Sequence, residues 1–307
     1  MVEAQVKSGI LEKVQLKLET TYGDGGAGSV ISDMLIRKLA WQADGHVTAN
    51  YSANGTGVAN TLTDGVLTFS GSMDTYLADG RELQLAIGTP GGVSPNFTIA
   101  YATTLPSFGF FSIEDGDEQK VNGSGFKVSK ATIKGSKGNK VEVSYDLVGR
   151  NVVETSTTIT PGTATTKPFV DLDTVMTING GTAVNLEDWQ LVISRDTETR
   201  RGIQDVDDDE KRLITSAFEK KLSVTGSGTA IADKAILRAL LGGTTLEDFR
   251  TPADIVITIS NSTNTITFTT NALISVVGKD TGAEDDLMLM KFDFVGISIA
   301  VAGTYTA

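Results

Sequence analysis

Cysteine is absent from this chain of 307 residues, and histidine occurs only once, as His46. Without cysteine the chain cannot form a disulfide framework, a thiolate nucleophile or a cysteine-ligated zinc site. A single histidine excludes a two-histidine metal site and leaves acid–base chemistry near neutral pH to carboxylates. We therefore expect neither a bound metal nor a cofactor.

Basic residues and long apolar runs are scarce as well. Lys and Arg number 26 against 38 Asp and Glu, so the net charge of −12 has the wrong sign for a protein that grips phosphate backbones. The longest apolar tracts, such as Ala272–Gly278 and Val295–Gly303, fall far short of the roughly 20 residues that span a bilayer. The first residues hold no apolar stretch of signal-peptide length, so we expect a protein made in the cytoplasm that acts without a membrane.

Most segments alternate apolar and polar residues with period two, as half-buried strands do. Examples are Leu16–Leu18, Lys140–Tyr145 and Ile255–Ile259. Joints rich in Gly and Asn, at 135–139, 179–181 and 261–264, separate such segments and have the chemistry of hairpin turns. The pattern predicts a mainly β fold with antiparallel strands.

Two short segments break the alternation. Ile231–Leu241 reads IADKAILRALL, carries apolar residues near one helical face and stops at Gly242-Gly243. Leu77–Ile87, closed by Gly88, is a weaker counterpart in the first half. We expect a short helix to flank a β-sandwich in each half.

The two halves of the chain also resemble each other. Leu67-Thr-Phe-Ser-Gly-Ser72 matches Leu222-Ser-Val-Thr-Gly-Ser227, and Tyr145-Asp-Leu-Val-Gly149 matches Phe292-Asp-Phe-Val-Gly296 in the same order. The Thr- and Pro-rich stretch after Val153 is typical of a connector. We therefore predict one β-sandwich domain over residues 1–160 and a second over 161–307, related by internal duplication.

The acidic run from Asp205 to Glu210 has part of the spacing of a calcium-binding loop. Asp205, Asp207 and Asp209 take positions one, three and five, but Glu210 stands where glycine is needed and Ser216 where glutamate is needed. We interpret the run, which includes Asp208, as a solvated loop.

A second charged feature is a basic stripe: Lys127, Lys130, Lys134, Lys137 and Lys140. Binding of single-stranded nucleic acid would call for aromatic stacking partners. The aromatic residues nearby, Phe126 and Tyr145, lie at alternating strand positions that indicate core. The stripe is interpreted as a solvated strand and hairpin tip, with ion pairs to a neighbouring subunit as the alternative.

Enzymatic activity finds little support in the chain. The acidic clusters Glu114–Glu118 and Glu284–Asp286 could supply glycosidase carboxylates, but that chemistry needs two carboxylates across a sugar-binding cleft, usually with aromatic platforms. Aromatic residues make up only 7% of the chain, and Trp41 and Trp189 are interpreted as core anchors. We expect no enzyme.

Small motifs along most of the chain resemble those of the tail tube proteins of long-tailed phages and related viruses, in the duplicated two-domain form. Glu19-Thr-Thr-Tyr-Gly23 is similar to the N-terminal signature of that family. Phe126–Ile133 followed by Val141–Gly149 resembles the strand pair that closes its first domain. Trp189–Arg195, a long polar loop, Leu222–Ser227 and the last strand through Gly296 are similar in the second half.

This resemblance implies rings in which the sheets of all subunits join into one barrel around a lumen. A duplicated subunit would form a trimer with pseudo-sixfold symmetry, and stacked rings would make the tube that conducts viral DNA without binding it specifically. The implied partners are the tail terminator, tape measure and distal tail proteins. The implied location is the virion tail, after synthesis in the host cytoplasm.

The resemblance also places two long loops in contact with the neighbouring ring. One runs from about Gln42 to Thr61 and the other contains the acidic run. The residues expected to carry these contacts are His46, Tyr51, Asn54, Arg200, Asp205, Asp207, Asp208, Asp209 and Glu210. Lys130, Lys134 and Lys137 are candidates for ion pairs between subunits. The main alternative function is a two-domain cell-surface adhesin or an S-layer-like β protein.

Overall fold

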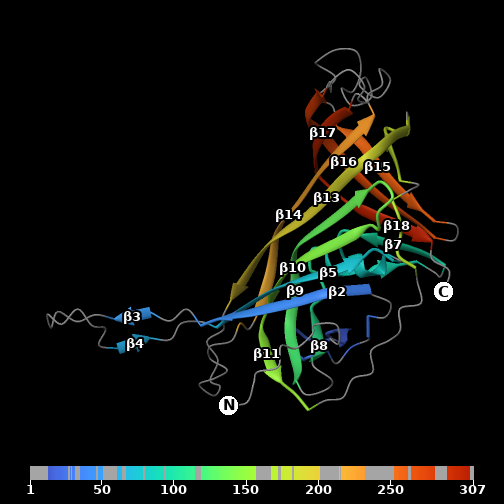
Figure 1. The fold of residues 1–307 in the computed structure, drawn as a ribbon. Coiled ribbons are helices and arrows are strands. Elements are labelled where there is room, and N and C mark those ends of the chain that lie inside the picture. Colours follow the sequence, from blue (N-terminus) through green and yellow to red (C-terminus); the bar gives the residue numbers. More distant parts are fainter. Residues whose placement is uncertain are drawn as a thin grey trace, which may run out of the picture.

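The computed structural model describes most of the chain, and nearly all of its regular secondary structure is β-strand (Figure 1). The described residues are 13–26, 28, 30–31, 35–45, 48–50, 61–63, 67–78, 80–92, 95–114, 119–156, 167–171, 174–181, 183–200, 214, 216–231, 252–261, 264–280 and 289–304. Among them, no helix has the length and apolar character needed to cross a membrane.

Every strand pairing in the described residues is antiparallel, which confirms the fold class predicted from the alternation. The first half contains β1 (Lys13–Leu18), β2 (Leu35–Asp44), β3 (Thr48–Asn50), β4 (Thr61–Thr63), β5 (Thr68–Tyr76), β6 (Pro90–Gly91), β7 (Asn96–Ala100), β8 (Phe108–Glu114), β9 (Gln119–Ser136), β10 (Glu142–Gly149) and β11 (Asn151–Glu154). The second half contains β12 (Val175–Ile178), β13 (Ala183–Arg200), β14 (Ser216–Ile231), β15 (Ala253–Ser260), β16 (Thr265–Asp280), β17 (Leu289–Gly296) and β18 (Ala300–Thr304).

The main strands of the two halves pair in the same order. In the first half β1, β8, β9, β10, β5 and β2 follow one another across the sheet. In the second half the order is β12, β15, β16, β17, β14 and β13. Each strand of the first series therefore has a counterpart in the second. In the second half β12 also pairs with β13, so its six strands close on themselves around a core.

The pairing registers agree as well as the strand order. Gly71 lies opposite Leu147 in the first half, and Gly226 lies opposite Phe294 in the second. Since Gly71 and Gly226 occupy the same place in the two matched sequence motifs, the pairing brings the matched segments together in identical register.

Two β-bulges recur at equivalent positions. The register between β2 and β5 shifts at Arg37, and that between β13 and β14 shifts at Glu187. The register between β9 and β10 skips Ser129, and that between β16 and β17 skips Ser275. Bulges bend a strand and are retained within families as built features, so their recurrence supports a common plan for both halves.

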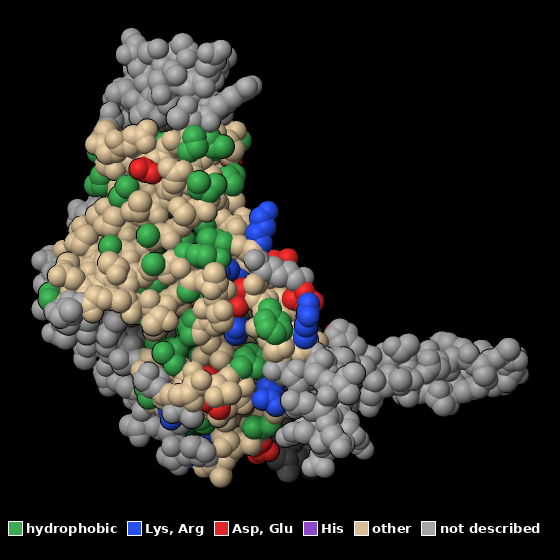
Figure 2. All heavy atoms as spheres, turned by 180° about the vertical axis from the view of Figure 1, so that it is seen from behind, with side chains coloured by type: hydrophobic (Ala, Val, Ile, Leu, Met, Phe, Trp, Pro, Cys, Tyr) green, Lys and Arg blue, Asp and Glu red, His purple; other side chains and the backbone are tan. Residues whose placement is uncertain are grey.

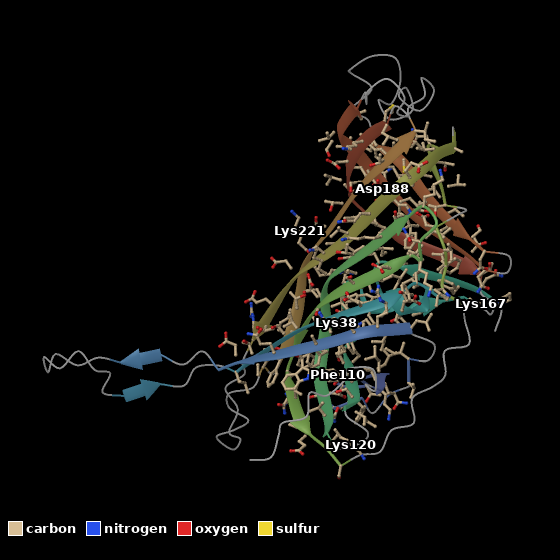
Figure 3. The ribbon with its side chains drawn as sticks, in the orientation of Figure 1. Lys38, Phe110, Lys120, Lys167, Asp188 and Lys221 are labelled. Carbon is tan, nitrogen blue, oxygen red and sulfur yellow. The ribbon has the colours of Figure 1, made fainter. Side chains whose placement is uncertain are left out.

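One hydrophobic core cluster extends through both halves. Phe108, Phe110 and Phe126 are fully buried in it, and the rings of Phe110 and Phe126 meet edge to face at 5.0 Å. Figure 3 labels Phe110 in the lower part of the molecule. One glycine in each half leaves room for an aromatic ring: a Cβ on Gly149 would lie 2.4 Å from Phe126 Cζ, and one on Gly226 would lie 2.1 Å from Phe294 Cζ.

The expected helix over Leu77–Ile87 is wrong in extent and type. The structure has a 3₁₀ helix over Arg81–Leu85, preceded by Gly80 in the left-handed conformation with φ of 83°. A Cβ at Gly80 would lie 2.8 Å from Ile266 Cδ1, so this turn is set by close packing. Of the second expected helix, Ile231 is the last residue of β14, and the remaining residues lie outside the described part of the chain.

The long loops expected in both halves are partly strand. β2 continues to Asp44, and β3 and β4 pair with each other to form an arm that extends away from the main sheet (Figure 1). β13 and β14 remain paired out to Arg200 and Ser216. The loop of the first half therefore does not begin at Gln42. The predicted domain boundary near residue 160 lies outside the described residues.

Candidate assembly surface

The two halves meet through a continuous strand pairing. Lys130–Ser136 of β9 pair with Asp188–Ser194 of β13, and we call this pairing the internal seam. Beyond the end of β9, the Lys137 amide donates to the Glu187 carbonyl at 2.9 Å, and Lys137 Nζ lies 2.6 Å from Glu187 Oε1. The seam joins two equivalent four-stranded sheets, β2-β5-β10-β9 and β13-β14-β17-β16, into one sheet.

This eight-stranded sheet stops at an edge strand on each side. Among the described strands, β2 pairs only with β5. At the other end, β15 pairs with β16 only as far as Ala272, so the outer edge of residues 273–280 has no described strand partner. Exposed backbone donors and acceptors on a strand edge are templates for pairing with another strand.

One face of the sheet covers the core, and the opposite one, which we call the outward face, carries small polar residues together with charged residues and a few valines. Alternation places Ser70, Ser72, Thr132, Ser144, Gln190, Ser194, Thr225 and Ser227 there. Two ion pairs lie on or beside this face: Lys130 Nζ lies 3.9 Å from Asp146 Oδ2, and Arg37 pairs with Glu142. The balance leaves no continuous basic track across the described outward face.

Seen from behind, the molecule also shows few charged side chains over its second half. In that view the second half is uppermost, and most of the charged groups that are drawn lie along one side and in the lower part (Figure 2). No three His, Cys, Asp or Glu residues of the described part lie together as metal ligands would.

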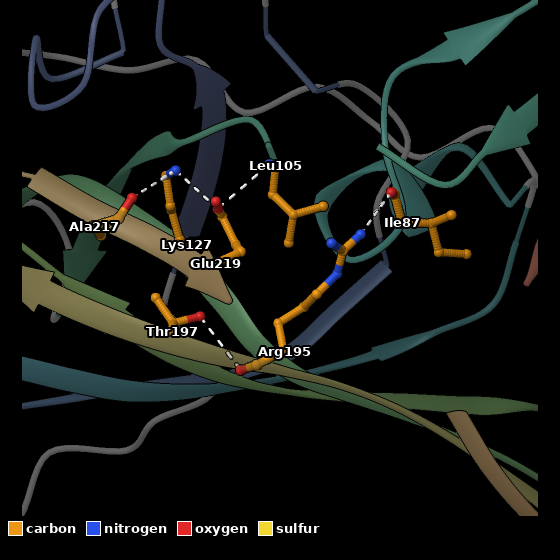
Figure 4. A network of polar contacts seen from close by, with 7 residues as sticks. All are labelled: Ile87, Leu105, Lys127, Arg195, Thr197, Ala217 and Glu219. Atoms are coloured by element: carbon orange, nitrogen blue, oxygen red, sulfur yellow. Dashed lines mark hydrogen bonds and ion pairs between the residues drawn. The ribbon is translucent and has the colours of Figure 1, made fainter. Parts of the chain in front are cut away.

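The far end of the β13–β14 hairpin lies over the first half and is anchored there by a buried ion pair (Figure 4). Lys127 Nζ of β9 lies 2.8 Å from Glu219 Oε1 of β14 and donates to the Ala217 carbonyl at 3.0 Å. Glu219 Oε1 also accepts from the Leu105 amide at 3.3 Å. Both side chains are almost fully buried, so this contact fixes the direction of the hairpin that ends at Arg200.

Arg195 provides a second anchor on the same hairpin. Its Nη2 donates to the Ile87 carbonyl at 3.1 Å (Figure 4). Its guanidinium lies 4.4 Å from the centre of the Tyr101 ring. Burial lowers the pKa of Arg195, while Tyr101 and Glu219 act in the opposite direction. The group has no acid–base task in this setting and serves to attach β13 to the segment before β8.

The Glu19–Gly23 motif forms a loop held by carboxylates. Glu19 accepts hydrogen bonds from the amides of Gly23 at 2.9 Å, Gly25 at 3.2 Å and Gly125 at 2.7 Å. Asp24 in turn accepts from the amides of Thr20 and Thr21. The motif thus ties the chain after β1 to the middle of β9, which is a structural role.

Few of the residues expected at ring contacts fall within the described part of the chain. Arg200 ends β13, is exposed, and lies 3.3 Å from Glu198 Oε1 through its Nε. His46, Tyr51, Asn54, Asp205, Asp207, Asp208, Asp209 and Glu210 lie outside the described residues. The contact role of these loops stays a prediction.

The basic stripe divides into one buried and several exposed lysines. The interpretation of a wholly solvated stripe is wrong for Lys127, which sequence reasoning missed because its partner Glu219 is 92 residues away. Lys130, Lys134, Lys137 and Lys140 are exposed, and Lys130 and Lys137 contact carboxylates of the same chain. Phe126 and Tyr145 are buried, as the alternation predicts.

The two tryptophans differ in environment, so the interpretation of both as core anchors is wrong for one of them. Trp189 is buried, and its Nε1 donates to Asp171 Oδ1 at 3.3 Å. Trp41 is 40% exposed on β2. Sequence reasoning did not identify the edges of β2 and β16 as candidate sites. The internal repeat could have indicated them, because it relates β2 to β13 and β16 to β9, the two strands of the seam.

A sheet that ends on strand edges without a described partner is suited to pairing with a further strand, as in structural proteins that assemble through their sheets. Comparison with protein families finds that residues 9–300 match the phage tail tube protein family. The chain belongs to this family, which suggests a structural, non-enzymatic role as a virion tail component that assembles into a tube with other tail components. A comparison with curated proteins finds no match.

Proposed function

We propose that this chain forms rings of three copies, each copy contributing two equivalent four-stranded sheets to one barrel with pseudo-sixfold symmetry. The observation that carries the proposal is the internal seam, which joins two sheets of identical strand order and leaves an open edge at either end. The matched registers and bulges support internal duplication as the origin of the two sheets.

The physical reason for ring closure lies in the edges themselves. The edge of β2 in one copy and the edge of β16 in the next are different surfaces, so their contact is heterologous. Repetition of such a contact gives a ring if the rotation between copies returns to the first copy, and a filament if it does not. When the ring closes, every open edge acquires a partner, and no template for further edge pairing remains.

Stacked rings would form the hollow tube through which viral DNA passes into the host. The outward face would line the lumen, where small polar residues and charges with opposite partners offer no basic track for phosphates. The arm of β3 and β4 and the β13–β14 hairpin would carry ring stacking. Tail terminator, tape measure and distal tail proteins are the proposed partners in the virion.

Negative-stain microscopy of the purified protein tests the proposal. We expect rings and hollow tubes, while monomers or planar arrays would support an adhesin or S-layer-like protein instead. Deletion of residues 51–60 or 203–212 should leave a folded protein that no longer forms tubes; normal tubes would contradict the stacking role. Circular dichroism confirms that each deletion variant is folded.

A further inference from the structure

We propose that Ala40–Ala43 of β2 pair with Val277–Asp280 of β16 in a second copy of this chain, in the register of the internal seam. The inference rests on the proposed function, because it assumes that copies join edge to edge. It goes further by assigning the partner residue at each position.

The register follows from the equivalence of the two halves. Gln42 lies opposite Ser70 on β5, and Val192 lies opposite Thr225, the counterpart of Ser70 on β14. Gln42 is therefore equivalent to Val192. By the same construction through β10 and β17, Gly278 is equivalent to Thr132.

The internal seam then dictates the pairing between copies. Val192 lies opposite Thr132 in the seam, so Gln42 should lie opposite Gly278 of the next copy. The neighbouring pairs of the seam transfer in the same way. They place Ala40 opposite Asp280, Trp41 opposite Lys279 and Ala43 opposite Val277.

The exposure of apolar side chains at the two edges supports pairing with a second copy of the chain. Leu191 in the seam is 1% exposed, whereas its equivalent Trp41 is 40% exposed. Lys127 is buried beneath the β13–β14 hairpin, whereas its equivalent Leu273 is 39% exposed. Apolar side chains are thus left open at the positions that the seam and the hairpin cover within one chain.

The charges on the seam and on the two open edges also support pairing between β2 and β16 of two copies. In the seam Lys134 lies diagonally from Asp188, one pair apart on the same face. Asp280 of β16 is equivalent to Lys134 of β9, and Lys38 of β2 is equivalent to Asp188 of β13 (Figure 3 labels Lys38 and Asp188). The basic residue is therefore on the first strand of the β9–β13 pair but on the second strand of the β16–β2 pair. Opposite charges across strands are favourable and like charges are not. The exchange therefore gives a β16–β2 pairing residues of opposite charge at the same diagonal positions as in the seam.

Disulfide trapping tests the register directly, because the chain has no cysteine of its own. The test variant carries Gln42→Cys and Gly278→Cys; a Cβ on Gly278 has room, with Lys291 O at 4.0 Å as its nearest neighbour. Directly opposed residues lie at Cα distances of about 4.5–5.5 Å, within the range of a disulfide. After assembly is verified by negative stain, mild oxidation should give covalent dimers and trimers on a non-reducing gel.

Two matched variants control the experiment. Thr132→Cys with Val192→Cys places the same pair in the internal seam and should form a disulfide within one chain, without multimers. Ala40→Cys with Gly278→Cys keeps both residues on the outward face but shifts the register by two, and it should give at most a few per cent of the trapped multimers.

The outcomes separate the inference from the proposed function. Rings in which only the shifted pair is trapped, or in which the internal control is oxidised but no multimers form, would overturn the register and leave the ring proposal intact. If negative-stain microscopy shows only monomers for every variant and for the unaltered protein, both the proposed function and the proposed register are wrong.

Discussion

At the scale of single residues, the buried Lys127–Glu219 pair has the largest expected effect on stability. Removal of one partner of a buried ion pair leaves an uncompensated charge, which costs about 3–5 kcal/mol, whereas replacement of both by apolar residues is close to neutral. We expect Glu219→Leu to lower the free energy of unfolding by about 3 kcal/mol and Lys127→Met with Glu219→Leu to restore most of it. Urea denaturation of each variant measures both effects.

An exposed pair on the same strand is the control for this prediction. Lys130 and Asp146 lie 3.9 Å apart and are both well exposed, so Asp146→Ala should change the free energy of unfolding by less than about 1 kcal/mol. A similar small loss for Glu219→Leu would contradict the structural role of the buried pair.

Tyr145 makes stability sensitive to alkaline pH. Its hydroxyl is buried and donates to the Glu82 carbonyl at 3.2 Å, and burial, followed by the nearby Glu82, raises its pKa well above the usual value. Below about pH 10 the tyrosine is neutral in both states and contributes no pH dependence. Above that value it ionises only in the unfolded chain, so stability falls as pH rises, by up to about 1.4 kcal/mol per pH unit.

The variant Tyr145→Phe isolates this effect. We expect it to be less stable than the unaltered protein at pH 8 by about 1 kcal/mol, because the hydrogen bond is lost. The difference should shrink as the pH rises from 9.5 to 11. Urea midpoints across this range measure the difference, and a constant gap would contradict the raised pKa.

At the scale of elements, register decides which residues meet. A shift of one residue turns every side chain of a strand to the opposite face, so the recurring bulges at Ser129 and Ser275 must occur in both halves if the faces are to match. The same constraint limits how an edge strand pairs, since only alignments that differ by an even number of residues keep the outward face of β2 on the same side as that of β16.

The exchanged charges provide a test at this scale. Lys38→Asp or Asp280→Lys should raise the concentration at which assembly begins by about threefold to tenfold, since each cross-strand pair contributes about 0.2–1 kcal/mol and a ring has several seams. The variant with both changes should return close to the unaltered value. Light scattering during dilution measures the onset.

Lys120→Asp is the matched control for the charge exchange. It makes the same change of charge on β9 at the lower end of the first half, far from either open edge (Figure 3). An equal effect from Lys120→Asp, or no rescue by the double variant, would contradict the proposed alignment.

At the scale of the whole molecule, the outward face determines how a tube would treat DNA. Because its described charges are balanced, we expect assembled rings not to sediment with short duplex DNA at about 50 mM salt. Three changes on this face, Ser70→Lys, Ser144→Lys and Ser227→Lys, should create a basic lumen that retains DNA at low salt and releases it at high salt. Retention by the unaltered rings would contradict a passive conduit.

The sequence by itself determined the strands, the turns and the correspondence between the halves. Alternation and turn residues are local signals, so β1, the hairpin turn after Ser136 and the matched glycines could be identified without coordinates. The family could also be predicted from the sequence, because short motifs occur along the chain in the same order as in the tail tube proteins.

Only the tertiary structure decided which edges stay open and which charged side chains are buried. Whether Trp41 is core or surface depends on what lies beside β2, and whether Lys127 is solvated depends on Glu219, which is distant along the chain. An alternation of period two divides the side chains of a strand between two faces but does not say where each face lies in the assembled sheet. The packing of one half against the other, which is a long-range property, assigns the outward face and the edges.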